Sequence, residues 1–423
     1  MTNKRIPEWL KLDNAAKIFP PTSTKRDSKV FRFSCELKEE IDPKLLQKAL
    51  DKNMLIFPFY RSVLKRGLFW YYLDYSHLLP TVHQEKEPIC SPLYNKNKKT
   101  LLFRVTYFKK RINLEVYHVL SDGTGALQFL KGLIYQYLLL KYPSLQEENI
   151  NMDYDASQYE KMDDSFQKYY DNKGKRKHTK IPKGFIITGK KHKEYQLQVI
   201  EGTVQTSAII SLAHQYHTTA TVLLTAIFIK AIELEMTIRE KRKPIIIAIP
   251  VNLRNYFSSQ SARNFFGVFN VIYFPNIKQE NSLEDIIPMI DQYFKTELKK
   301  EEMAAIINSY TSLEENPLLR IVPLFLKNFI LKIASKISER NTSTLSNVGK
   351  INLPQELQEY VNQFNVFMST NKIQVCVCSY LDKMTLSFTS PFLNTNIEKN
   401  FFRILSSFQM EAEITTNIWD KEE

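Results

Sequence analysis

Residues 117–125 decide how this chain is interpreted, and they read Tyr117-His118-Val119-Leu120-Ser121-Asp122-Gly123-Thr124-Gly125. A β-prone run ends at the histidine, and apolar residues at helical spacing begin a few positions later. A histidine at a strand end can be held rigidly and still face a cleft, and its usual pKa of about 6.5 lets it accept a proton at neutral pH. Asp122 lies across a turn, so we expect it to pair with a group behind the loop, such as an arginine, and not to form a triad. The stretch makes His118 a candidate general base, and an ordinary core or loop histidine is the alternative interpretation of this segment alone.

The sequence on both sides of this stretch alternates between strand and helix patterns. Period-2 and β-branched runs predict strands at 30–37, 67–73, 245–250 and 267–274, and hairpins at 101–117 and 373–390. Apolar residues at helical spacing predict helices at 44–52, 124–141, 207–216, 219–235, 286–299 and 397–411. Such a mixture predicts an α/β (α+β) protein.

The length of 423 residues exceeds a usual domain of roughly 100–200 residues, which favours two domains or two lobes. Residues 144–194 differ from their flanks, because they are acidic and tyrosine-containing at first and then strongly basic at 173–178. We therefore predict an N-terminal lobe at 1–145 that carries His118, an inter-lobe connection at 146–196, and a C-terminal lobe at 197–423.

Composition narrows the class of protein. The chain is 43% hydrophobic, 12% aromatic and 24% charged, which fits a globular protein and argues against a disordered or fibrous one. A net charge of +13 would attract nucleic acid, an anionic membrane or a phosphorylated ligand. Its lysines are spread along the chain beside many Ile, Asn and Tyr residues, which indicates codon bias. The one basic run lacks a recognised module, so no nucleic-acid partner is predicted.

Metal and redox sites are not predicted. The cysteines form no CxxC pair and no histidine has HExxH spacing, so we expect buried structural cysteines, no disulfide, no metal and no permanently bound cofactor; the four are Cys35, Cys90, Cys376 and Cys378. The N-terminal residues contain no secretory signal, and no stretch of about 20 apolar residues occurs. We expect a soluble, cytoplasmic protein.

Four segments together are similar to a known superfamily. His118-x-x-x-Asp122-Gly123 resembles the HxxxDG motif of the chloramphenicol acetyltransferase-like superfamily, which includes peptide-synthetase condensation domains and alcohol acetyltransferases. Two second-lobe segments also resemble it: Pro250 to Arg254 followed by Asn264 to Asn270, and Leu345-Ser346-Asn347-Val348-Gly349. The opening, Trp9 to Pro20, is similar to bacterial alcohol acetyltransferase-type proteins, as are Phe57 to Tyr60 and Gly67 to Trp70. The Asp-Phe-Gly-Trp-Gly signature of the plant enzymes is absent.

The resemblance implies two chloramphenicol acetyltransferase-like lobes, each a mixed sheet with helices, and an active-site cleft between them. His118 would remove the proton of an acceptor hydroxyl or amine, which attacks the thioester of an acyl-CoA co-substrate. Asp122 would form a structural ion pair with Arg254, and Gly123 would let the backbone approach the reacting carbonyl without a Cβ. The Gly123 amide, Ser346 or Asn347 would stabilise the tetrahedral oxyanion.

The function implied is an acyl-CoA-dependent O-acyltransferase, with alcohol O-acetyltransferase as the narrower expectation. Two alternatives stay open: a carrier-protein-dependent condensation or esterification enzyme, and a non-catalytic binding or scaffold protein that keeps the fold. The acyl chain length, the acceptor and the oligomeric state are not predicted.

Residues 318–337 suggest a further partner. Apolar clusters alternate there with four cations, as in a basic helix that lies at a membrane surface; the cations are Arg320, Lys327, Lys332 and Lys336. Weak association with an anionic membrane is one interpretation. An amphipathic core helix interrupted at Pro323 is the other.

Overall fold

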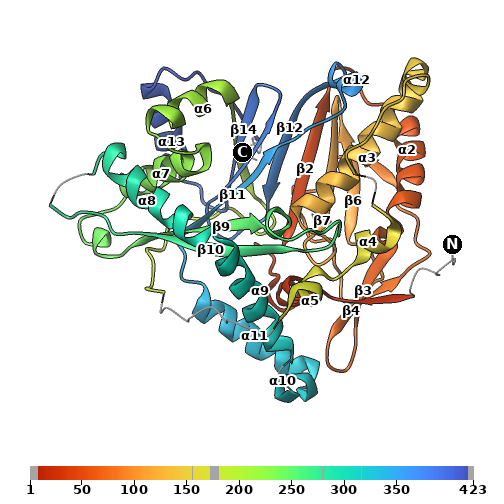
Figure 1. Cartoon of the computed structure of the whole chain (residues 1–423), viewed down its shortest axis with the longest axis horizontal. Coiled ribbons are helices and arrows are strands. Elements are labelled where there is room, and N and C mark those ends of the chain that lie inside the picture. Colours follow the sequence, from red (N-terminus) through yellow and green to blue (C-terminus); the bar gives the residue numbers. More distant parts are fainter. Residues whose placement is uncertain (1–7, 155, 172–180, 279–280, 316, 418–423) are drawn as a thin grey trace.

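The computed structural model describes residues 8–154, 156–171, 181–278, 281–315 and 317–417. Its strands and helices form two lobes that lie side by side, with the early part of the chain on the right of Figure 1. The predicted mixed α/β architecture is confirmed. The basic run at 173–178 and the first seven residues lie outside the described residues.

The N-terminal lobe is built on a five-stranded sheet in the order β12-β2-β7-β6-β5. Two long helices, α2 (Pro43–Ile56) and α3 (Gly123–Lys141), pack together on one face of it (Figure 1). The four strands from this part of the chain are β2 (Val30–Leu37), β5 (Val82–Gln84), β6 (Phe103–Phe108) and β7 (Arg111–Tyr117). The hairpin and helix predicted around His118 are thus confirmed, with bounds that differ by at most two residues.

The fifth strand of this sheet comes from the far end of the chain. β12 (Val361–Met368) pairs antiparallel with β2 along nearly its whole length, and the two lie next to each other in Figure 1. Its other side contacts the C-terminal lobe, since the Thr385 hydroxyl and the Cys378 thiol both donate to the Phe364 carbonyl. A strand from the C-terminal part of the chain therefore completes the N-terminal sheet, which the sequence patterns did not indicate.

The C-terminal lobe contains a seven-stranded sheet in the order β10-β9-β11-β13-β14-β8-β15. Most neighbours are antiparallel, but β11 runs parallel to both β9 and β13. The strands are β8 (Gln198–Gln205), β9 (Ile245–Asn252), β10 (Phe266–Tyr273), β11 (Ser343–Lys350), β13 (Gln374–Tyr380), β14 (Lys383–Ser390) and β15 (Glu413–Thr416). Its helices are α6 (Thr206–Gln215), α7 (Ala220–Glu233), α8 (Leu283–Glu297) and α13 (Asn396–Ser407).

The segment between β9 and β10 joins the lobes. Residues 253–265, here called the crossing loop, reach the N-terminal end of α3, where the Ser121 hydroxyl donates to the Ala262 carbonyl. Two short helices of the inter-lobe connection, α4 (Gln158–Met162) and α5 (Ser165–Tyr169), lie against this loop. Ala262 donates its backbone N–H to the Lys161 carbonyl at 2.9 Å, and Ser261 donates its hydroxyl to the Asp163 carbonyl at 2.7 Å. The N-terminal end of α3, next to His118, thus lies where both lobes and the inter-lobe connection meet.

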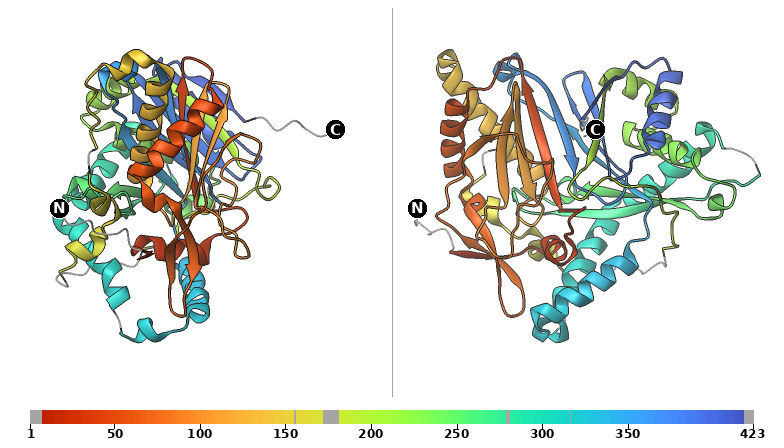
Figure 2. Two further views of the ribbon diagram at one scale, coloured as in Figure 1. Left: turned by 90° about the vertical axis from the view of Figure 1, so that its right-hand side faces the viewer. Right: turned by 180° about the vertical axis from the view of Figure 1, so that it is seen from behind.

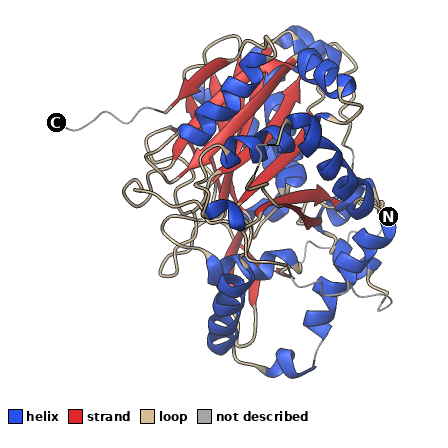
Figure 3. Cartoon of the chain, turned by 90° about the vertical axis from the view of Figure 1, so that its left-hand side faces the viewer, coloured by secondary structure: helices blue, strands red, loops and turns tan. Residues whose placement is uncertain are grey.

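Three further helices follow α8: α9 (Lys300–Glu315), α10 (Pro317–Ile321) and α11 (Leu324–Ser338). α9 packs against the body of the molecule, because Met303, Ile306 and Ile307 are buried in one cluster with Leu253 and Phe265 of the crossing loop. α10 and α11 project at the lower edge of both views in Figure 2, and Figure 3 shows helical segments extending below the strand-rich body. The helix break predicted at Pro323 is confirmed, because α11 begins directly after it. Within the described part of the chain, every helix is too short or too polar to span a bilayer.

The strand predicted at 67–73 is only partly confirmed, because Tyr71, Tyr72 and Leu73 belong to β4 but the four residues before them do not. Residues 67–70 form the turn between β3 (Ser62–Arg66) and β4 (Tyr71–Tyr75), and β1 (Trp9–Lys11) adds a third strand to this small sheet. The aromatic residues of this run are typical of a strand, but Leu68 and Phe69 are exposed in the turn and do not alternate between a buried and an exposed side.

All four cysteines are free and buried. Burial raises the pKa of each thiol well above its usual range. Cys376 and Cys378 share one face of β13 and belong to the same apolar core, so their prediction as small buried hydrophobic residues is confirmed.

Candidate active site

His118 follows β7 directly, and its backbone N–H donates to the Lys29 carbonyl at 2.9 Å. Three phenylalanines surround its half-buried ring. Phe19 stacks on it at 4.5 Å between ring centroids, Phe31 meets it edge-on at 5.1 Å, and Phe266 lies at 5.3 Å. Phe19 and Phe31 belong to the N-terminal lobe and Phe266 begins β10, so both lobes hold the ring in place.

The hydrogen bond of His118 Nδ1 fixes the orientation and the tautomer of the ring. Nδ1 lies 2.9 Å from Oδ1 of Asn264 in the crossing loop. The Asn264 amide nitrogen donates to Oδ2 of Asp13 at 3.1 Å, so Oδ1 is the atom left to accept from the histidine. Nδ1 therefore carries the proton, and Nε2 has a free lone pair, as a general base requires.

Asp13 anchors this chain of hydrogen bonds in the interior. It is almost fully buried, and its Oδ1 accepts from the Ala16 backbone N–H at 2.8 Å. Arg263 lies 3.7 Å from Oδ2. Burial raises the pKa of Asp13 to about 6, although the charge of Arg263 opposes that change.

Burial lowers the pKa of His118 below its usual value of 6.5. Asp122 and the hydrogen bond to Asn264 oppose this effect. The imidazole is therefore neutral at pH 7 and able to accept a proton.

Asp122 caps α3 and connects it to the other lobe. Its Oδ1 accepts from the Gly125 N–H at 2.9 Å, which is the N-cap bond of the helix. Its Oδ2 accepts from Nη1 of Arg254 at 2.7 Å and from the Phe265 N–H at 2.8 Å. Asp122 does not hydrogen-bond to His118; its carboxylate is fully used behind the loop, which agrees with the expectation from spacing.

Arg254 is not a surface arginine. Its side chain is 10% exposed, and besides Asp122 it donates to the carbonyls of Ser261, Arg263 and Phe265 and to Oδ1 of Asn252. The ion pair that the resemblance implied is therefore present, and it also shapes the crossing loop that carries Asn264.

The two glycines after Asp122 differ in their surroundings. A Cβ on Gly123 would meet only the Phe33 ring, at an ordinary 3.9 Å, so the protein itself leaves that side open. A Cβ on Gly125 would lie 2.0 Å from the Ala262 carbonyl oxygen and 2.4 Å from the Ser121 hydroxyl. Gly125 is therefore required for contact between α3 and the crossing loop, a role that the sequence did not indicate.

The two polar residues predicted on β11 have different partners. The Asn347 amide nitrogen donates to the Thr221 hydroxyl at 2.8 Å, and its oxygen accepts from the Gly349 N–H at 2.8 Å. Ser346 lines the same cavity as His118, and its hydroxyl has no hydrogen-bond partner among the residues that the structure describes. The Ser346 hydroxyl is therefore available to a ligand, whereas Asn347 already uses its oxygen and one of its two amide N–H groups within the protein.

A cavity of about 680 Å³ contains these groups. From the N-terminal lobe it is lined by Phe19, Lys29, His118, Asp122 and Gly123, and from the C-terminal lobe by Thr221, Val251, Phe266, Ser346 and Asn347, among others. Its volume falls within the usual range for small-molecule sites. All six site residues predicted from the sequence lie in or directly behind this cavity.

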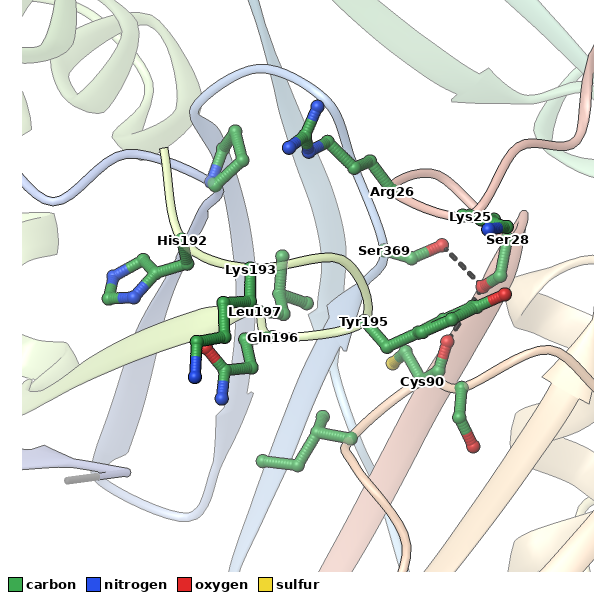
Figure 4. Close-up of a pocket in the computed structure, with 13 residues that line it drawn as sticks. Lys25, Arg26, Ser28, Cys90, His192, Lys193, Tyr195, Gln196, Leu197 and Ser369 are labelled. Carbon is green, nitrogen blue, oxygen red and sulfur yellow. Dashed lines mark hydrogen bonds between the residues drawn. The ribbon is translucent and has the colours of Figure 1, made fainter. Parts of the chain in front are cut away.

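A second, much smaller hollow is drawn in Figure 4. It is lined by Lys25, Arg26, Cys90, His192 and Tyr195. Beside it the Ser28 hydroxyl donates to the Cys90 carbonyl and is hydrogen-bonded to the Ser369 hydroxyl. Its volume of about 20 Å³ is enough for a water molecule and too small for a substrate. The cavity at His118, which is large enough for a substrate and contains the candidate base, is therefore the candidate active site.

No metal centre is formed in the described ranges, where no three His, Cys, Asp or Glu side chains are grouped to hold an ion. The site consists of one base, its hydrogen-bond chain, a capped helix and a free hydroxyl. Such a set suits proton transfer from a nucleophile followed by its addition to a carbonyl.

Asn264 and Asp13 are the site residues that sequence reasoning missed. Both lie inside segments that carried the family resemblance, but neither was assigned a role. Their separation from His118 in the sequence, 146 residues for Asn264, hides the contact. A buried acid and an amide in segments already singled out were the only available signal.

No family model and no curated protein sequence matches the chain. Several solved structures do match the chain in fold. The TRI101 protein of Fusarium sporotrichioides, complexed with coenzyme A and T-2, matches with a TM-score of 0.63 at 11% identity, over 96% of this chain and 99% of that one. Trichothecene 15-O-acetyltransferase from the same organism matches with a TM-score of 0.56 at 13% identity, over 95% and 94%.

The starter condensation domain of rhizomide synthetase, in complex with C8-CoA, is also similar. Its TM-score is 0.59 at 10% identity, over 95% of this chain and 94% of that one. The chain therefore shares the two-lobed fold of these acetyltransferase and condensation-domain structures, which is the fold that its HxxxDG segment led us to expect.

Proposed function

We propose that this protein is an acyltransferase that moves an acyl group from a coenzyme A thioester to the hydroxyl of a small-molecule alcohol, with His118 as the general base. The observation that carries the proposal is the tautomer of His118: Asn264 accepts from Nδ1, and Nε2 is left with a free lone pair. The cavity that contains this ring is lined by both lobes.

In the proposed reaction, Nε2 takes the proton of the acceptor hydroxyl while the oxygen attacks the thioester carbonyl carbon. The tetrahedral intermediate then collapses, the C–S bond breaks, and the thiolate of coenzyme A takes the proton back from Nε2. No acyl-enzyme forms, and His118 ends the cycle neutral. An amine acceptor would react by the same steps.

The intermediate carries a negative oxygen, which needs a hydrogen-bond donor. Ser346 is the donor that we favour, because its hydroxyl has no hydrogen-bond partner among the described residues, whereas Asn347 is held in place by Thr221 and Gly349. The N–H of Gly123, at the N-terminus of the 19-residue helix α3, is the second donor of the proposal. Asp122 and Arg254 act at a distance, by holding α3 and the crossing loop in register.

The choice of coenzyme A as donor is supported by the similar structures, two of which were solved with coenzyme A or C8-CoA. A short acyl group and an alcohol acceptor remain the narrower proposal, from the resemblance to bacterial alcohol acetyltransferase-type proteins. A carrier-protein thioester is the alternative donor.

The test is release of free thiol from acetyl-CoA and longer acyl-CoAs with a panel of alcohols and amines. We expect release that requires an acceptor and falls by about 10²–10⁴-fold in His118→Ala, the usual contribution of a general base. If the folded protein turns over no coenzyme A thioester but does transfer an acyl group from a carrier protein, the carrier protein is the acyl donor in place of coenzyme A. Failure with both donors would leave the non-catalytic alternative.

A further inference from the structure

Helix α11 has its apolar side turned outward. Phe325 is 70% exposed and Phe329 is 64% exposed, and Leu326, Ile330 and Ile333 are exposed beside them. These positions follow helical spacing and form one face. Lys327, on the inward side of the helix, is buried together with Leu324. In a core helix the two faces would be reversed, so the amphipathic core interpretation of this segment is wrong for α11.

Specific polar bonds hold the helix in this orientation. The Lys327 ammonium donates to the Phe69 carbonyl at 3.0 Å and lies 3.3 Å from the centre of the Trp70 ring. The Asn328 amide donates to the Tyr71 hydroxyl at 3.0 Å, and the Leu324 N–H donates to the Leu68 carbonyl at 2.9 Å. Lys327 was grouped with the membrane-facing cations in the sequence, and its inward position removes it from that group.

The turn beside the helix extends the apolar surface. Leu68 and Phe69 at the tip of the β3–β4 turn are exposed, and so is Ile321 at the end of α10. We call the exposed residues together the apolar face: Leu68, Phe69, Ile321, Phe325, Leu326, Phe329, Ile330 and Ile333. Single exposed apolar residues are ordinary, but a contiguous set of this kind marks a binding surface.

Cations border the apolar face. Lys332 and Lys336 are exposed on α11, and neither has an ion-pair partner among the described residues. Phe325, Phe329 and Lys332 also line an adjacent groove of about 830 Å³, whose far wall carries the exposed Arg66 and Lys96. The groove borders α1 (Phe19–Thr22), the short helix whose Phe19 stacks on His118.

We propose that the apolar face docks on the surface of an anionic lipid bilayer, with Phe325 and Phe329 inserted among the lipids and Lys332 and Lys336 at the phosphate level. Buried apolar area and attraction of cations to anionic headgroups are the two terms that hold an interfacial helix. A second copy of the chain fits less well, because a twofold contact would place the unpaired lysines of both copies in one interface, and the residues of the apolar face include no acid to pair with them.

The experiment is co-sedimentation of the full chain with vesicles of phosphatidylcholine alone and of phosphatidylcholine mixed with phosphatidylserine. We expect binding to the mixed vesicles, weaker binding to phosphatidylcholine, and loss of binding at high salt. The double variants Phe325→Ser/Phe329→Ser and Lys332→Glu/Lys336→Glu should each weaken binding at least tenfold. The matched control is Lys44→Glu/Lys48→Glu on α2, which has the same charge change on exposed residues of a different face.

The proposal is independent of acyl transfer, and its readout needs no substrate. It is overturned if the native protein stays in the supernatant with the mixed vesicles, or if both α11 variants bind as well as the α2 control. A concentration-dependent dimer that Phe325→Ser/Phe329→Ser abolishes, without vesicle binding, would assign the apolar face to a second copy instead. Because the substituted side chains are exposed, we expect melting temperatures close to that of the native protein.

Discussion

His118 donates its Nδ1 proton to Asn264, a residue of the opposite lobe, at 2.9 Å. The base and the group that orients it therefore come from different lobes, and the catalytic tautomer exists only when the crossing loop is in place. Any change that displaces this loop should therefore lower kcat, the rate of the chemical step, more than it raises KM.

Replacing Asn264 tests this relationship. In Asn264→Ala we expect kcat to fall by about 10- to 100-fold, part of the roughly 10²–10⁴-fold that a general base contributes. KM should change little, since Asn264 lies behind the ring. The acid limb of the kcat/KM profile should also move to lower pH, because this hydrogen bond raises the pKa of His118. An unchanged limb with a lowered melting temperature would make the role of Asn264 structural only.

The pH dependence of the native protein is the second prediction. Burial lowers the pKa of His118 below 6.5, so its neutral, proton-accepting form persists to lower pH than in a free histidine. We expect the acid limb of the kcat/KM profile to have its midpoint below pH 6.5. Initial rates across the acid range at fixed ionic strength check this, and a midpoint above 6.5 would contradict it.

The Asp122–Arg254 pair should matter mainly for stability. Arg254→Met leaves a buried carboxylate without its cation, and breaking such a pair costs about 3–5 kcal/mol of unfolding free energy. The matched control is Lys295→Met, which removes the exposed partner of Asp291 and should cost less than about 1 kcal/mol. Urea unfolding of both variants compares them, and equal losses would refute a special role for Arg254.

The two glycines after Asp122 should give opposite results. Gly123→Ala has room in the protein, so we expect native stability and a reduced kcat, because the new methyl group enters the cavity. Gly125→Ala collides with the Ala262 carbonyl and should lower the melting temperature and the yield of folded protein. Thermal melts and turnover assays on the two variants separate the roles, and a fully active, stable Gly125→Ala would show that the loop can yield.

Ser346 is the test of the oxyanion donor. Removing one such donor typically costs about 10²–10³ in kcat. We expect a loss of that order in Ser346→Ala with KM preserved. Asn347→Ala should mainly reduce stability, because its amide serves Thr221 and Gly349. If Asn347→Ala lost more of kcat than Ser346→Ala, the assignment of donors would be reversed.

Local sequence was enough to select His118, Asp122 and Gly123 as candidate site residues, because a strand end, a helix cap and a turn depend on residues that are close together in the chain. The partners Asn264 and Asp13 could not be predicted, since only the packing of two lobes brings them to the ring. The sheet to which β12 belongs could not be predicted for a similar reason, because the sequence of a strand carries no information about which sheet it joins. The orientation of α11 went against the general rule that apolar faces point inward.

The position of β12 has a consequence for how the protein is made. Synthesis runs from the N-terminus, so β2 leaves the ribosome more than 300 residues before its neighbour Val361–Met368 does. Until then the N-terminal sheet has an open edge, of the kind that other chains can pair with. The emergence of Val361–Met368 from the ribosome is therefore the event that covers the open edge of β2 and protects the nascent N-terminal sheet from pairing with other chains.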